Sequence, residues 1–551
     1  MHAILYFTEM KGVREIKLTA VCLFFLACTV QSMWSVPARG GWQLKQTTDG
    51  SWVRVCQSGD EYYHYWSTED GKLAEMQADG KFVLTNKPVP TQEQVRVRRA
   101  AASSYARAPQ AIGKPYLPLR GLVILAGFKD LPYEAGNDSL GMWEMMNKSG
   151  YNFNGATGSA RDYFIAQSDS QYMPVFDVVG PIVLPKNRAY YGENVSSAST
   201  VDKNAKQMII DACTAVDAYV DFSIYDCDGD GSIDFVYVLF AGIGANDYNG
   251  EADAVWPHND HVGGNNKFDG KKLYNYACSG EIDGGTGDRN GIGTLCHEFG
   301  HVMGLPDYYD TNYSTNCNER LTPNDWSVMD VGSYNNCCKT PPNYSLFDKY
   351  YMGWLTPKVL DKDSALDVTI GTGYADGYQL TRDGESVPCS QPDTVYYIEN
   401  RQNTGWDVHT PGHGMLVWQV VYNESAWTNN TPNNAAYKPR YTVKSAANGY
   451  IGAQYETPGV CEKVPYSTFN TFPGSSQVTN VTLMPGYAMT EISEVNGDIR
   501  FKLNGGSPAT KGERLEVKGE RRKVLLNGQI YIQNQDKIYT IFGQQTNTFN
   551  N

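Results

Sequence analysis

The sequence predicts an α/β domain in the middle of the chain, with a strand-rich module before it and a β-rich domain after it. Apolar runs at 121–126 and 235–240 have the length and composition of buried strands, and helical patterns at 160–167 and 202–219 lie between them. Strands that alternate with helices are typical of α/β domains. Beyond Trp354 the pattern changes to short strands separated by polar turns. A chain of 551 residues has room for about three or four domains.

The composition is typical of a globular, exported protein. Hydrophobic residues make up 41% of the chain, and 54 glycines and 38 tyrosines favour strands and loops over disorder. The formal net charge of −14 and the lack of a basic cluster argue against nucleic-acid binding. A negative surface instead suits a solvated extracellular protein with cation-binding loops. Some of the 12 cysteines could pair after export.

Residues 1–38 predict a signal peptide. Basic residues precede an apolar run at 18–30, which matches the core of a signal peptide and is too short to span a bilayer. Small and helix-breaking residues follow, so we expect cleavage near Ser35 or Ala38. A lipoprotein signal at Cys28 is the weaker alternative. No other segment is apolar enough to be a transmembrane segment, so we expect a secreted, extracellular or cell-surface protein.

Between the signal peptide and the α/β domain, a strand-rich module is followed by a change in composition. Residues 39–90 alternate apolar and polar side chains between Asp-Gly and Gly-Asp turns, which is a pattern of short strands. Residues 91–115 are instead rich in Gln, Ala, Ser, Pro and Arg. A solvated linker would explain this composition. We favour a processing site near Arg98-Arg99 or Arg107, at which an inhibitory propeptide is removed.

The most informative motif is the HExxH sequence of residues 297–301. Its two histidines, His297 and His301, lie one turn apart on one helical face, so both imidazoles can reach one cation. Glu298 is placed to hold and deprotonate a metal-bound water rather than to act as a ligand. The motif can arise by chance in an ordinary helix. With 8 histidines in the chain, however, such a chance match has odds on the order of one in a hundred.

The residues after the motif suggest where a third ligand comes from. Gly304 falls where the helix must end and the chain reverse, a position that often needs positive φ. After that turn, Asp307 or Asp310 can return to the metal as the third protein ligand. The fourth position would stay open for water and substrate, which is typical of a catalytic zinc site and not of a structural one.

A second set of oxygen ligands lies in the segment 226–234, which resembles a calcium loop. Position 12 of that loop is Tyr237 and not a bidentate glutamate, so the segment is no complete EF-hand. A plain Asp-rich turn is the alternative, but we expect a structural Ca²⁺. The side-chain ligands would be Asp226, Asp228, Asp230 and Asp234, with the carbonyl group of Ser232.

Met329 and Tyr334, which follow the HExxH helix in the sequence, are further candidates for the site. Met329 lies in a turn that looks like the one placing a methionine beneath the zinc of metzincins, although a lone methionine is usually a core residue. Tyr334 could donate a hydrogen bond to the oxyanion of a tetrahedral intermediate, with packing as the plainer explanation. His258 and His261 could line the cleft, but we expect neither to be a ligand.

These residues resemble the immune inhibitor A family of secreted bacterial metalloendopeptidases, peptidase family M6. The match is most specific over residues 297–310, which are similar to that family's HExxHxxGxPDxYD. It covers roughly residues 40–505. The resemblance implies His297, His301 and Asp307 as zinc ligands and Glu298 as the general base.

The resemblance also implies a zincin-type (metzincin-like) α/β catalytic domain with a strand-rich propeptide and a C-terminal β-sandwich-like domain. Residues 520–551 resemble the sorting tails of type IX secretion, which would make a secretion machinery a partner. The expected organisation is a signal peptide (1–38), a propeptide and linker (39–118), a zinc metallopeptidase catalytic domain (119–360), a β-rich domain (361–507) and a linker with a sorting-like tail (508–551).

We therefore expect a secreted zinc-dependent endopeptidase that hydrolyses protein or peptide substrates by Glu-assisted attack of a zinc-bound water. The expected cofactors are Zn²⁺ and Ca²⁺. The alternative is a catalytically decayed surface adhesion or binding protein on a protease scaffold. Retention of both histidines, Glu298 and Asp307 argues against decay.

Overall fold

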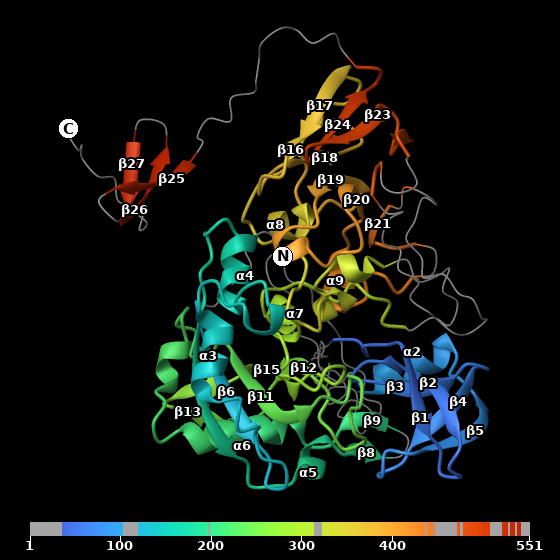
Figure 1. Ribbon diagram of the computed structural model, residues 1–551, viewed down its shortest axis with the longest axis vertical. Helices are drawn as coiled ribbons and strands as arrows, with labels where there is room; N and C mark the ends of the chain where they lie inside the picture. The colour runs from blue at the N-terminus through green and yellow to red at the C-terminus, as the bar shows by residue number, and fades with distance from the viewer. Residues whose placement is uncertain are drawn as a thin grey trace, which may run out of the picture.

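The computed structural model describes most of the chain between residues 36 and 540. The described ranges are 36–102, 119–196, 199–312, 322–435, 438–444, 446, 471–473, 478–506, 521–526, 529–534 and 537–540. Residues 1–35 of the predicted signal peptide, Arg107 in the predicted linker and residues 541–551 of the predicted tail lie outside these ranges. Figure 1 shows the N-terminal sheet in blue beside the α/β domain in cyan and green, with the β-rich domain in yellow and orange above them.

The N-terminal module is a five-stranded antiparallel sheet in the order β1-β2-β3-β4-β5. Gly50 (φ +88°) and Gly80 (φ +75°) take left-handed turn conformations that favour glycine, which explains the Asp-Gly pairs of the sequence. A small core of Val55, Trp66 and Phe82 packs on one face of the sheet. The strands are β1 (Trp42–Gln46), β2 (Trp52–Gly59), β3 (His64–Thr68), β4 (Lys72–Met76) and β5 (Phe82–Pro88).

Helix α2 (Gln92–Ala102) follows this sheet, so the expectation of an irregular linker from residue 91 is wrong for the first part of that segment. Val95 on this helix is fully buried in a cluster with Tyr63 and Tyr309. Arg99 forms an ion pair of 2.8 Å with the buried carboxylate of Asp60. These contacts stabilise the helix, because Val95 is buried on its apolar face and Arg99 forms an ion pair on its polar face.

The α/β domain is built on a five-stranded sheet in the order β12-β15-β11-β6-β7. The strands β15, β11, β6 and β7 are parallel, and β12 lies antiparallel at the edge beside β15. Residues 121–127 are buried without interruption, as expected for a parallel strand covered on both faces. The strands of this sheet are β6 (Arg120–Gly127), β7 (Val175–Val183), β11 (Val236–Ile243), β12 (His258–His261) and β15 (Asn275–Ile282).

Helices and short elements surround this sheet. The helices are α3 (Ser139–Asn147), α4 (Ala160–Gln167), α5 (Arg188–Gly192), α6 (Ala205–Val216), α7 (Gly293–Val302) and α8 (Leu346–Tyr351), with 3-10 turns η1 (Phe153–Gly155), η2 (Phe222–Tyr225), η4 (Asn324–Trp326) and η5 (Val331–Tyr334). The remaining strands are β8 (Asn194–Ser196), β9 (Ser199–Asp202), β10 (Ser232–Ile233), β13 (Lys267–Phe268) and β14 (Lys271–Leu273).

Helix α7 is held against the sheet by an aromatic cluster. The ring of Phe299 lies 5.2 Å from that of Phe164, 5.7 Å from that of Phe176 and 4.8 Å from that of Phe235. The cluster therefore joins α7 to α4, to β7 and to the entry of β11. Aromatic contacts of this kind fix the rotation of a helix about its axis as well as its depth. The opposite face of α7 is left to point away from this cluster.

The C-terminal domain consists of two sheets that contribute to one core. One sheet has the order β16-β18-β19-β20-β21 and the other β17-β24-β23-β22. Ile398 and Val417 from the first sheet pack in the same cluster as Ile370 and Phe501 from the second. The elements are β16 (Lys358–Val359), β17 (Leu366–Ile370), β18 (Gly377–Leu380), β19 (Val395–Arg401), η6 (Gly405–Asp407), β20 (Gly414–Val420), α9 (Glu424–Thr428), β21 (Tyr441–Val443), β22 (Val481–Thr482), β23 (Ala488–Val495) and β24 (Asp498–Leu503).

Three further strands form a separate small sheet in the tail. They are β25 (Arg521–Leu526), β26 (Gln529–Asn534) and β27 (Lys537–Thr540). Within the described ranges, no helix is long and apolar enough to cross a membrane. Some cysteine pairing was expected, but the following described residues are free thiols: Cys213, Cys227, Cys278, Cys296, Cys337, Cys338 and Cys389.

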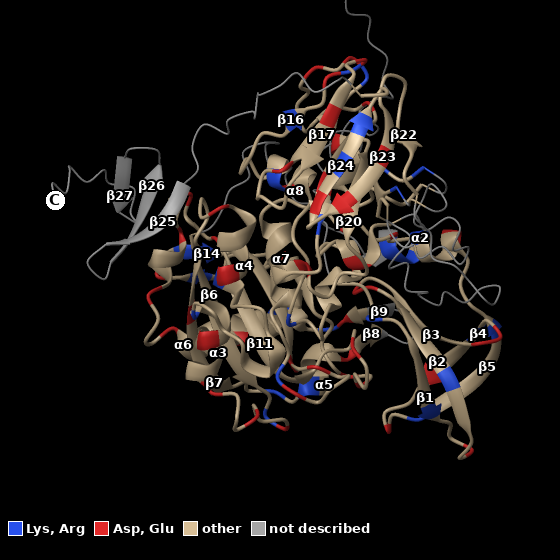
Figure 2. Cartoon of the chain, turned by 45° about the horizontal axis from the view of Figure 1, so that its top comes forward, with Lys and Arg blue, Asp and Glu red and all other residues tan. Residues whose placement is uncertain are grey.

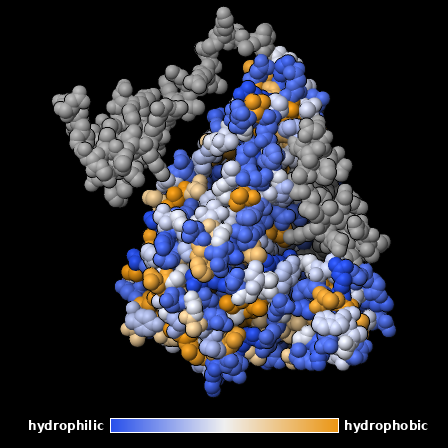
Figure 3. Space-filling model, in the orientation of Figure 1, coloured by the Kyte–Doolittle hydropathy of each residue, from blue (hydrophilic) through white to orange (hydrophobic). Residues whose placement is uncertain are grey.

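Charged and apolar residues are distributed over the surface rather than gathered on one element. Figure 2 shows acidic and basic residues scattered over the N-terminal sheet, the α/β domain and the β-rich domain. On the described part of the face in Figure 3, hydrophobic residues lie scattered among hydrophilic ones. Single exposed apolar residues of this kind are normal for folded proteins.

A buried arginine joins the β-rich domain to the α/β domain. Arg401 donates to Glu399 at 2.9 Å and to Asp407 at 2.8 Å within the β-rich domain. The same guanidinium donates to the backbone carbonyls of Asn343 and Tyr344, both at 3.1 Å. Since only 3% of the Arg401 side chain is exposed, these bonds replace nearly all of its hydration.

We expect Arg401→Ala to lower the free energy of unfolding by about 3–5 kcal/mol, because it leaves two buried carboxylates without their cation. Arg382→Ala is the control, since its pair with Asp393 is exposed and should be worth about 0–1 kcal/mol. Urea unfolding followed by tryptophan fluorescence measures both. Equal losses in the two variants would contradict this role for Arg401.

Candidate metal centre

Helix α7 carries the HExxH motif in a fully buried position. All of its residues from Gly293 to Val302 are buried. His297 and His301 lie on the same face, and their Nε2 atoms are 3.1 Å apart. Because Phe299 points into the aromatic cluster, its packing sets the rotation at which both imidazoles face away from that cluster.

A tight turn after the helix returns an aspartate to the histidines. Gly304 has a φ of +101°, a left-handed conformation that favours glycine, and the chain reverses there. Oδ1 of Asp307 then lies 3.1 Å from Nε2 of His297 and 3.3 Å from Nε2 of His301. Asp310 lies elsewhere in this loop, where its Oδ1 accepts a hydrogen bond of 2.9 Å from the backbone N–H of Asn312. The structure thus brings Asp307, and not Asp310, to the two histidines.

Backbone carbonyls set the tautomer of both imidazoles. Nδ1 of His297 donates to the carbonyl of Val328 at 2.7 Å, and Nδ1 of His301 donates to the carbonyl of Leu305 at 2.8 Å. A neutral imidazole carries one proton, so each Nε2 presents its lone pair. Burial lowers the pKa of His301, which favours this neutral form.

The three converging atoms fit a divalent metal ion. Asp307 Oδ1 is buried and receives no hydrogen bond, and both Nε2 atoms offer lone pairs. A tetrahedral zinc with bonds of about 2.0–2.1 Å would hold its ligand atoms roughly 3.3 Å apart, which is close to the observed 3.1 and 3.3 Å. Two nitrogens and one carboxylate oxygen are also a donor set that zinc prefers. This group of residues could therefore hold a metal.

Glu298 faces the same space without joining the cluster of ligand atoms. Its Oε1 accepts a hydrogen bond of 3.1 Å from the backbone N–H of Val36, and its Oε2 is buried without a hydrogen bond. Burial and the charge of Asp307 raise the pKa of Glu298 well above the usual value, and the N–H of Val36 partly offsets this. One oxygen of Glu298 is therefore available for proton transfer.

Met329 packs against the motif at Gly300, and its role in a Met-turn stays a prediction. A Cβ at Gly300 would come within 2.5 Å of the Met329 sulfur, so only glycine leaves room for this side chain. The carbonyl of Met329 accepts from the N–H of Tyr308 at 2.8 Å, next to Asp307. The preceding residue, Val328, supplies the carbonyl that orients His297. The turn thus supports the metal ligands from below.

Tyr334 presents its hydroxyl to the cleft. The hydroxyl donates to the carbonyl of Pro37 at 2.6 Å and accepts from Nδ2 of Asn246 at 2.7 Å. Burial raises the pKa of Tyr334 well above its usual value, so the group remains a donor. The two other candidate histidines, His258 and His261, lie on the edge strand β12 and are not part of the metal-ligand group.

Residues Val36 and Pro37 fill the space between Glu298, Trp256 and Tyr334, which is called the cleft here, and the sequence did not predict these contacts. The carbonyl of Val36 accepts from Nε1 of Trp256 at 3.2 Å, and its N–H reaches Glu298. Residues 36–38 were assigned to the signal peptide, yet Val36 is fully buried in the structure. No pattern in the sequence marks these residues as partners of the cleft, because their contacts lie more than two hundred residues away along the chain.

Asn430, in the β-rich domain, is a second residue that the sequence analysis missed. Its Nδ2 donates to Oδ2 of Asp307 at 2.5 Å, and its Oδ1 accepts from the N–H of Asp307 at 2.6 Å. Asn433 adds a bond of 2.6 Å to the carbonyl of Tyr308. The amide of Asn430 therefore fixes the oxygen of Asp307 that does not face the histidines. Partners of this kind orient a metal ligand and tune its affinity.

The Asp-rich loop brings three of its four predicted carboxylates together. Ligand oxygens of Asp226, Asp228 and Asp234 lie within 4.8 Å of one another. Asp230 is not part of this group. Lys271 forms an ion pair of 2.6 Å with Asp226, so one positive charge already lies at the loop.

Hydrogen bonds within this loop are those of an Asp-rich turn. The backbone N–H of Asp230 donates to Asp228 at 3.0 Å, and the N–H of Ser232 donates to Asp230 at 2.7 Å. The plain turn that was the alternative in the sequence analysis accounts for these bonds. Calcium binding at this loop is not supported and stays a prediction.

A parallel α/β sheet, a buried HExxH helix, a carboxylate that returns to it and a Met-containing turn define a metallopeptidase domain. Residues 141–355 match the catalytic domain of immune inhibitor A peptidase M6.

Two named proteins are similar in sequence to part of this chain. The pre-pro-metalloprotease PrtV of Vibrio cholerae serotype O1 is 28% identical over 258 residues, which are 39% of this chain and 27% of PrtV. Immune inhibitor A of Bacillus thuringiensis subsp. alesti is 28% identical over 221 residues, which are 35% of this chain and 31% of that protein. The match thus spans less than a third of the length of either relative. These matches do not support the resemblance of the tail to type IX sorting signals.

We expect Asn430→Ala to weaken zinc binding by about 10- to 100-fold, because Asp307 loses the partner that orients its carboxylate. Asn429→Ala is the matched control, since Asn429 is exposed and bonds only to Ser425 on its own helix. Competition with a zinc chelator, on protein shown by circular dichroism to be folded, measures the affinity. Unchanged affinity in the Asn430 variant would contradict this role.

Proposed function

We propose that this protein is a secreted zinc endopeptidase that hydrolyses peptide bonds in proteins or peptides. The observation that carries the proposal is the buried convergence of His297, His301 and Asp307 beside Glu298. We further propose a zincin-type, metzincin-like fold for the α/β domain and a β-sandwich for the C-terminal domain. Zinc held there would act as a Lewis acid on the scissile carbonyl and lower the pKa of a water molecule.

The residues of the chain supply the other parts of the reaction. Glu298 takes the proton of the attacking water at a carboxylate oxygen and passes it to the leaving amine. The contact of Glu298 with the N–H of Val36 supports this role, because it places the carboxylate against the nitrogen of a peptide group. Tyr334 donates a hydrogen bond from its hydroxyl group to a peptide carbonyl of the substrate, as it does to the carbonyl of Pro37.

The intact set of side chains also bears on the alternative of a decayed binding protein. Loss of catalysis usually begins with replacement of the base or of a ligand. Here Glu298, both histidines and Asp307 are present and correctly oriented by Val328, Leu305 and Asn430. A binding protein would not need this orientation, so we favour the enzyme.

Glu298→Gln should keep its zinc and lose at least about 100-fold in kcat, because the amide cannot accept the proton. Glu281→Gln is the control, because it replaces another buried glutamate, on β15. That glutamate accepts hydrogen bonds from the backbone N–H of Glu134 and from Nδ2 of Asn137, among others. Metal content by mass spectrometry and cleavage of labelled casein, both after removal of residues 36–118, measure the two effects. Loss of zinc, or substantial remaining turnover, would contradict the role of Glu298.

We also propose that residues from Val36 to the end of α2 are an inhibitory propeptide. The proposal is supported by Val36, which covers Glu298, and by Gln57, which donates to the carbonyl of Ala245 in the α/β domain at 3.0 Å. The stacked rings of His64 and Trp256, with centroids 4.3 Å apart, extend this contact. A cleft filled in this way cannot admit a substrate.

The position of α2 bears on where the propeptide is cleaved. Arg98 and Arg99 lie within this helix, and Arg99 is paired with Asp60 and packed over the ring of Tyr62. A protease needs an extended segment, so the helix argues against cleavage at Arg98-Arg99, and we propose that cleavage falls beyond α2, at the predicted site near Arg107. The buried position of Val36 favours signal-peptide cleavage near Ser35 over cleavage near Ala38.

We expect the active form to begin after residue 102, and the form that begins near residue 36 to be latent. N-terminal sequencing of secreted protein, together with casein cleavage at each stage of processing, measures this. Full activity in protein that still begins near residue 36 would show that the N-terminal module is a permanent domain.

The calcium site and a secretion partner for the tail are separate predictions, and this proposal does not depend on them.

A further inference from the structure

A pocket with two buried acidic side chains lies next to the N-terminal segment. The residue that occupies it, Arg39, follows three residues after Val36, which contacts Glu298. The pocket contains the carboxylates of Asp247 and Asp283, whose side chains are 5% and 0% exposed. The guanidinium of Arg39 occupies it: Nη1 lies 2.8 Å from Oδ1 of Asp247 and 2.6 Å from Oδ2 of Asp283. The pocket belongs to the α/β domain, and its occupant belongs to the N-terminal segment.

The α/β domain holds both carboxylates without help from Arg39. Asp247 accepts from the N–H of Tyr248 at 2.6 Å and from the N–H of Gly284 at 2.9 Å. Asp283 accepts from the N–H of Thr286 at 2.8 Å. A Cβ at Gly284 would come within 1.6 Å of the Tyr248 carbonyl, so the two loops pack backbone to backbone. The pocket is therefore preorganised and should persist when the N-terminal segment leaves.

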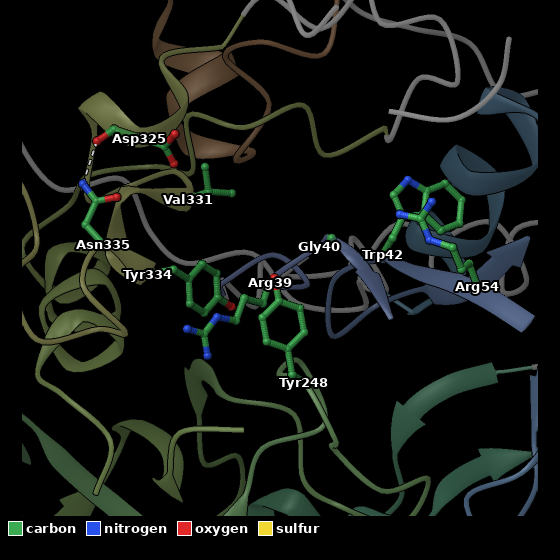
Figure 4. Close-up of a pocket in the computed structure, with 10 residues that line it drawn as sticks. Arg39, Gly40, Trp42, Arg54, Tyr248, Asp325, Val331, Tyr334 and Asn335 are labelled. Carbon is green, nitrogen blue, oxygen red and sulfur yellow. Dashed lines mark hydrogen bonds between the residues drawn. The ribbon is translucent and has the colours of Figure 1, made fainter. Parts of the chain in front are cut away.

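Two aromatic rings complete the pocket. The guanidinium carbon of Arg39 lies 4.8 Å from the ring centroid of Tyr248 and 5.7 Å from that of Tyr334. Figure 4 shows Arg39 between these two rings, and all three side chains line a solvent-open cavity of about 490 Å³. Val331 and Asp325 line the cavity further along. A side chain that entered from the cleft would thus meet an aromatic face on the way to the acids.

The pocket lies within a few residues of the reacting bond. Val36 contacts the catalytic glutamate through its N–H, and the carbonyl of Pro37 takes the hydroxyl of Tyr334. Arg39 follows three residues after Val36, and its N–H donates to the carbonyl of Asn246 at 2.9 Å. Three residues of extended chain span at most about 10 Å. A substrate that lies in the cleft as this segment does would place one side chain in the pocket.

Removal of the guanidinium leaves two neighbouring buried carboxylates without a cation, which is unfavourable. A basic side chain from a substrate restores the pairing. Nη1 of Arg39 donates to both acids, and a lysine ammonium could make the same two bonds. Arginine suits the pocket better than lysine because its planar group also packs over the ring of Tyr248.

We propose that Asp247 and Asp283 form a specificity pocket that selects substrates with arginine, and less strongly lysine, within about three residues of the cleaved bond. Arg39 of the N-terminal segment occupies this pocket as a substrate side chain would. This inference rests on the proposed peptidase function, and it names the substrate class for that site.

The first test uses protein from which residues 36–118 have been removed by processing. The substrates are peptides of one sequence. At each position within three residues of the cleaved bond, they carry arginine, lysine, glutamine or glutamate in turn. At one position we expect kcat/KM to be about 10- to 100-fold higher for arginine than for glutamine, as expected for hydrogen bonds to a buried charge. Equal rates for all four residues at every position would overturn the proposal.

Variants of the pocket identify the residues responsible. Asp247→Asn and Asp283→Asn should each reduce the arginine-to-glutamine ratio, while cleavage of the glutamine peptide continues. Asp325→Asn is the matched control, since Asp325 lines the cavity that Arg39 also lines, but it takes no part in the contact of Arg39 with Asp247 and Asp283. A ratio that stays high in both pocket variants would overturn the assignment.

A second measurement does not depend on these variants folding. An acetylated peptide of residues 36–42 should inhibit the processed protein at least about tenfold more strongly than the same peptide with Arg39→Gln. Equal inhibition would overturn the proposal. If the processed protein cleaves neither casein nor any peptide, the proposed function fails. Cleavage of casein without preference for arginine means that only the specificity pocket fails.

Discussion

Two imidazole nitrogens and one carboxylate oxygen meet within 3.3 Å in the buried centre of the α/β domain. Each imidazole donates its Nδ1–H to a backbone carbonyl, so the lone pairs of the Nε2 atoms face one another there. A metal ion bound there would offset this repulsion, and several other features of the centre maintain the arrangement. The cluster around Phe299 sets the rotation of α7, Gly304 allows the return of Asp307, and Met329 fills the space beneath.

The β-rich domain is part of this arrangement and not an appendage to it. Asn430 forms two hydrogen bonds with Asp307. A side chain of the β-rich domain thus orients a proposed metal ligand of the α/β domain. Arg401 makes the interface between these domains rigid with a buried ion network. This explains why a match confined to residues 141–355 describes only part of the centre. The α/β domain alone would hold Asp307 less firmly.

The N-terminal segment and the cleft are complementary in shape and in charge. The N–H of Val36 meets the carboxylate of Glu298, the carbonyl of Pro37 meets the hydroxyl of Tyr334, and the guanidinium of Arg39 meets two acids. These are the groups through which a peptide substrate would be recognised. Latency and specificity would then depend on the same contacts, since a segment that binds as a substrate does must also be displaced before a substrate can bind.

The sequence by itself determined the local chemistry of this protein. Helical periodicity places His297 and His301 on one face whatever the rest of the fold does, and uninterrupted apolar runs mark the parallel strands. The spacing of the motif alone left Asp307 and Asp310 open, although the family resemblance implied Asp307. The sequence also assigned residues 36–38 to the signal peptide and missed helix α2. Those matters were decided by tertiary structure, as were Asn430, 123 residues from Asp307, and Arg39, 208 residues from Asp247. Contacts over such separations depend on how whole domains pack, and no spacing in the sequence encodes them.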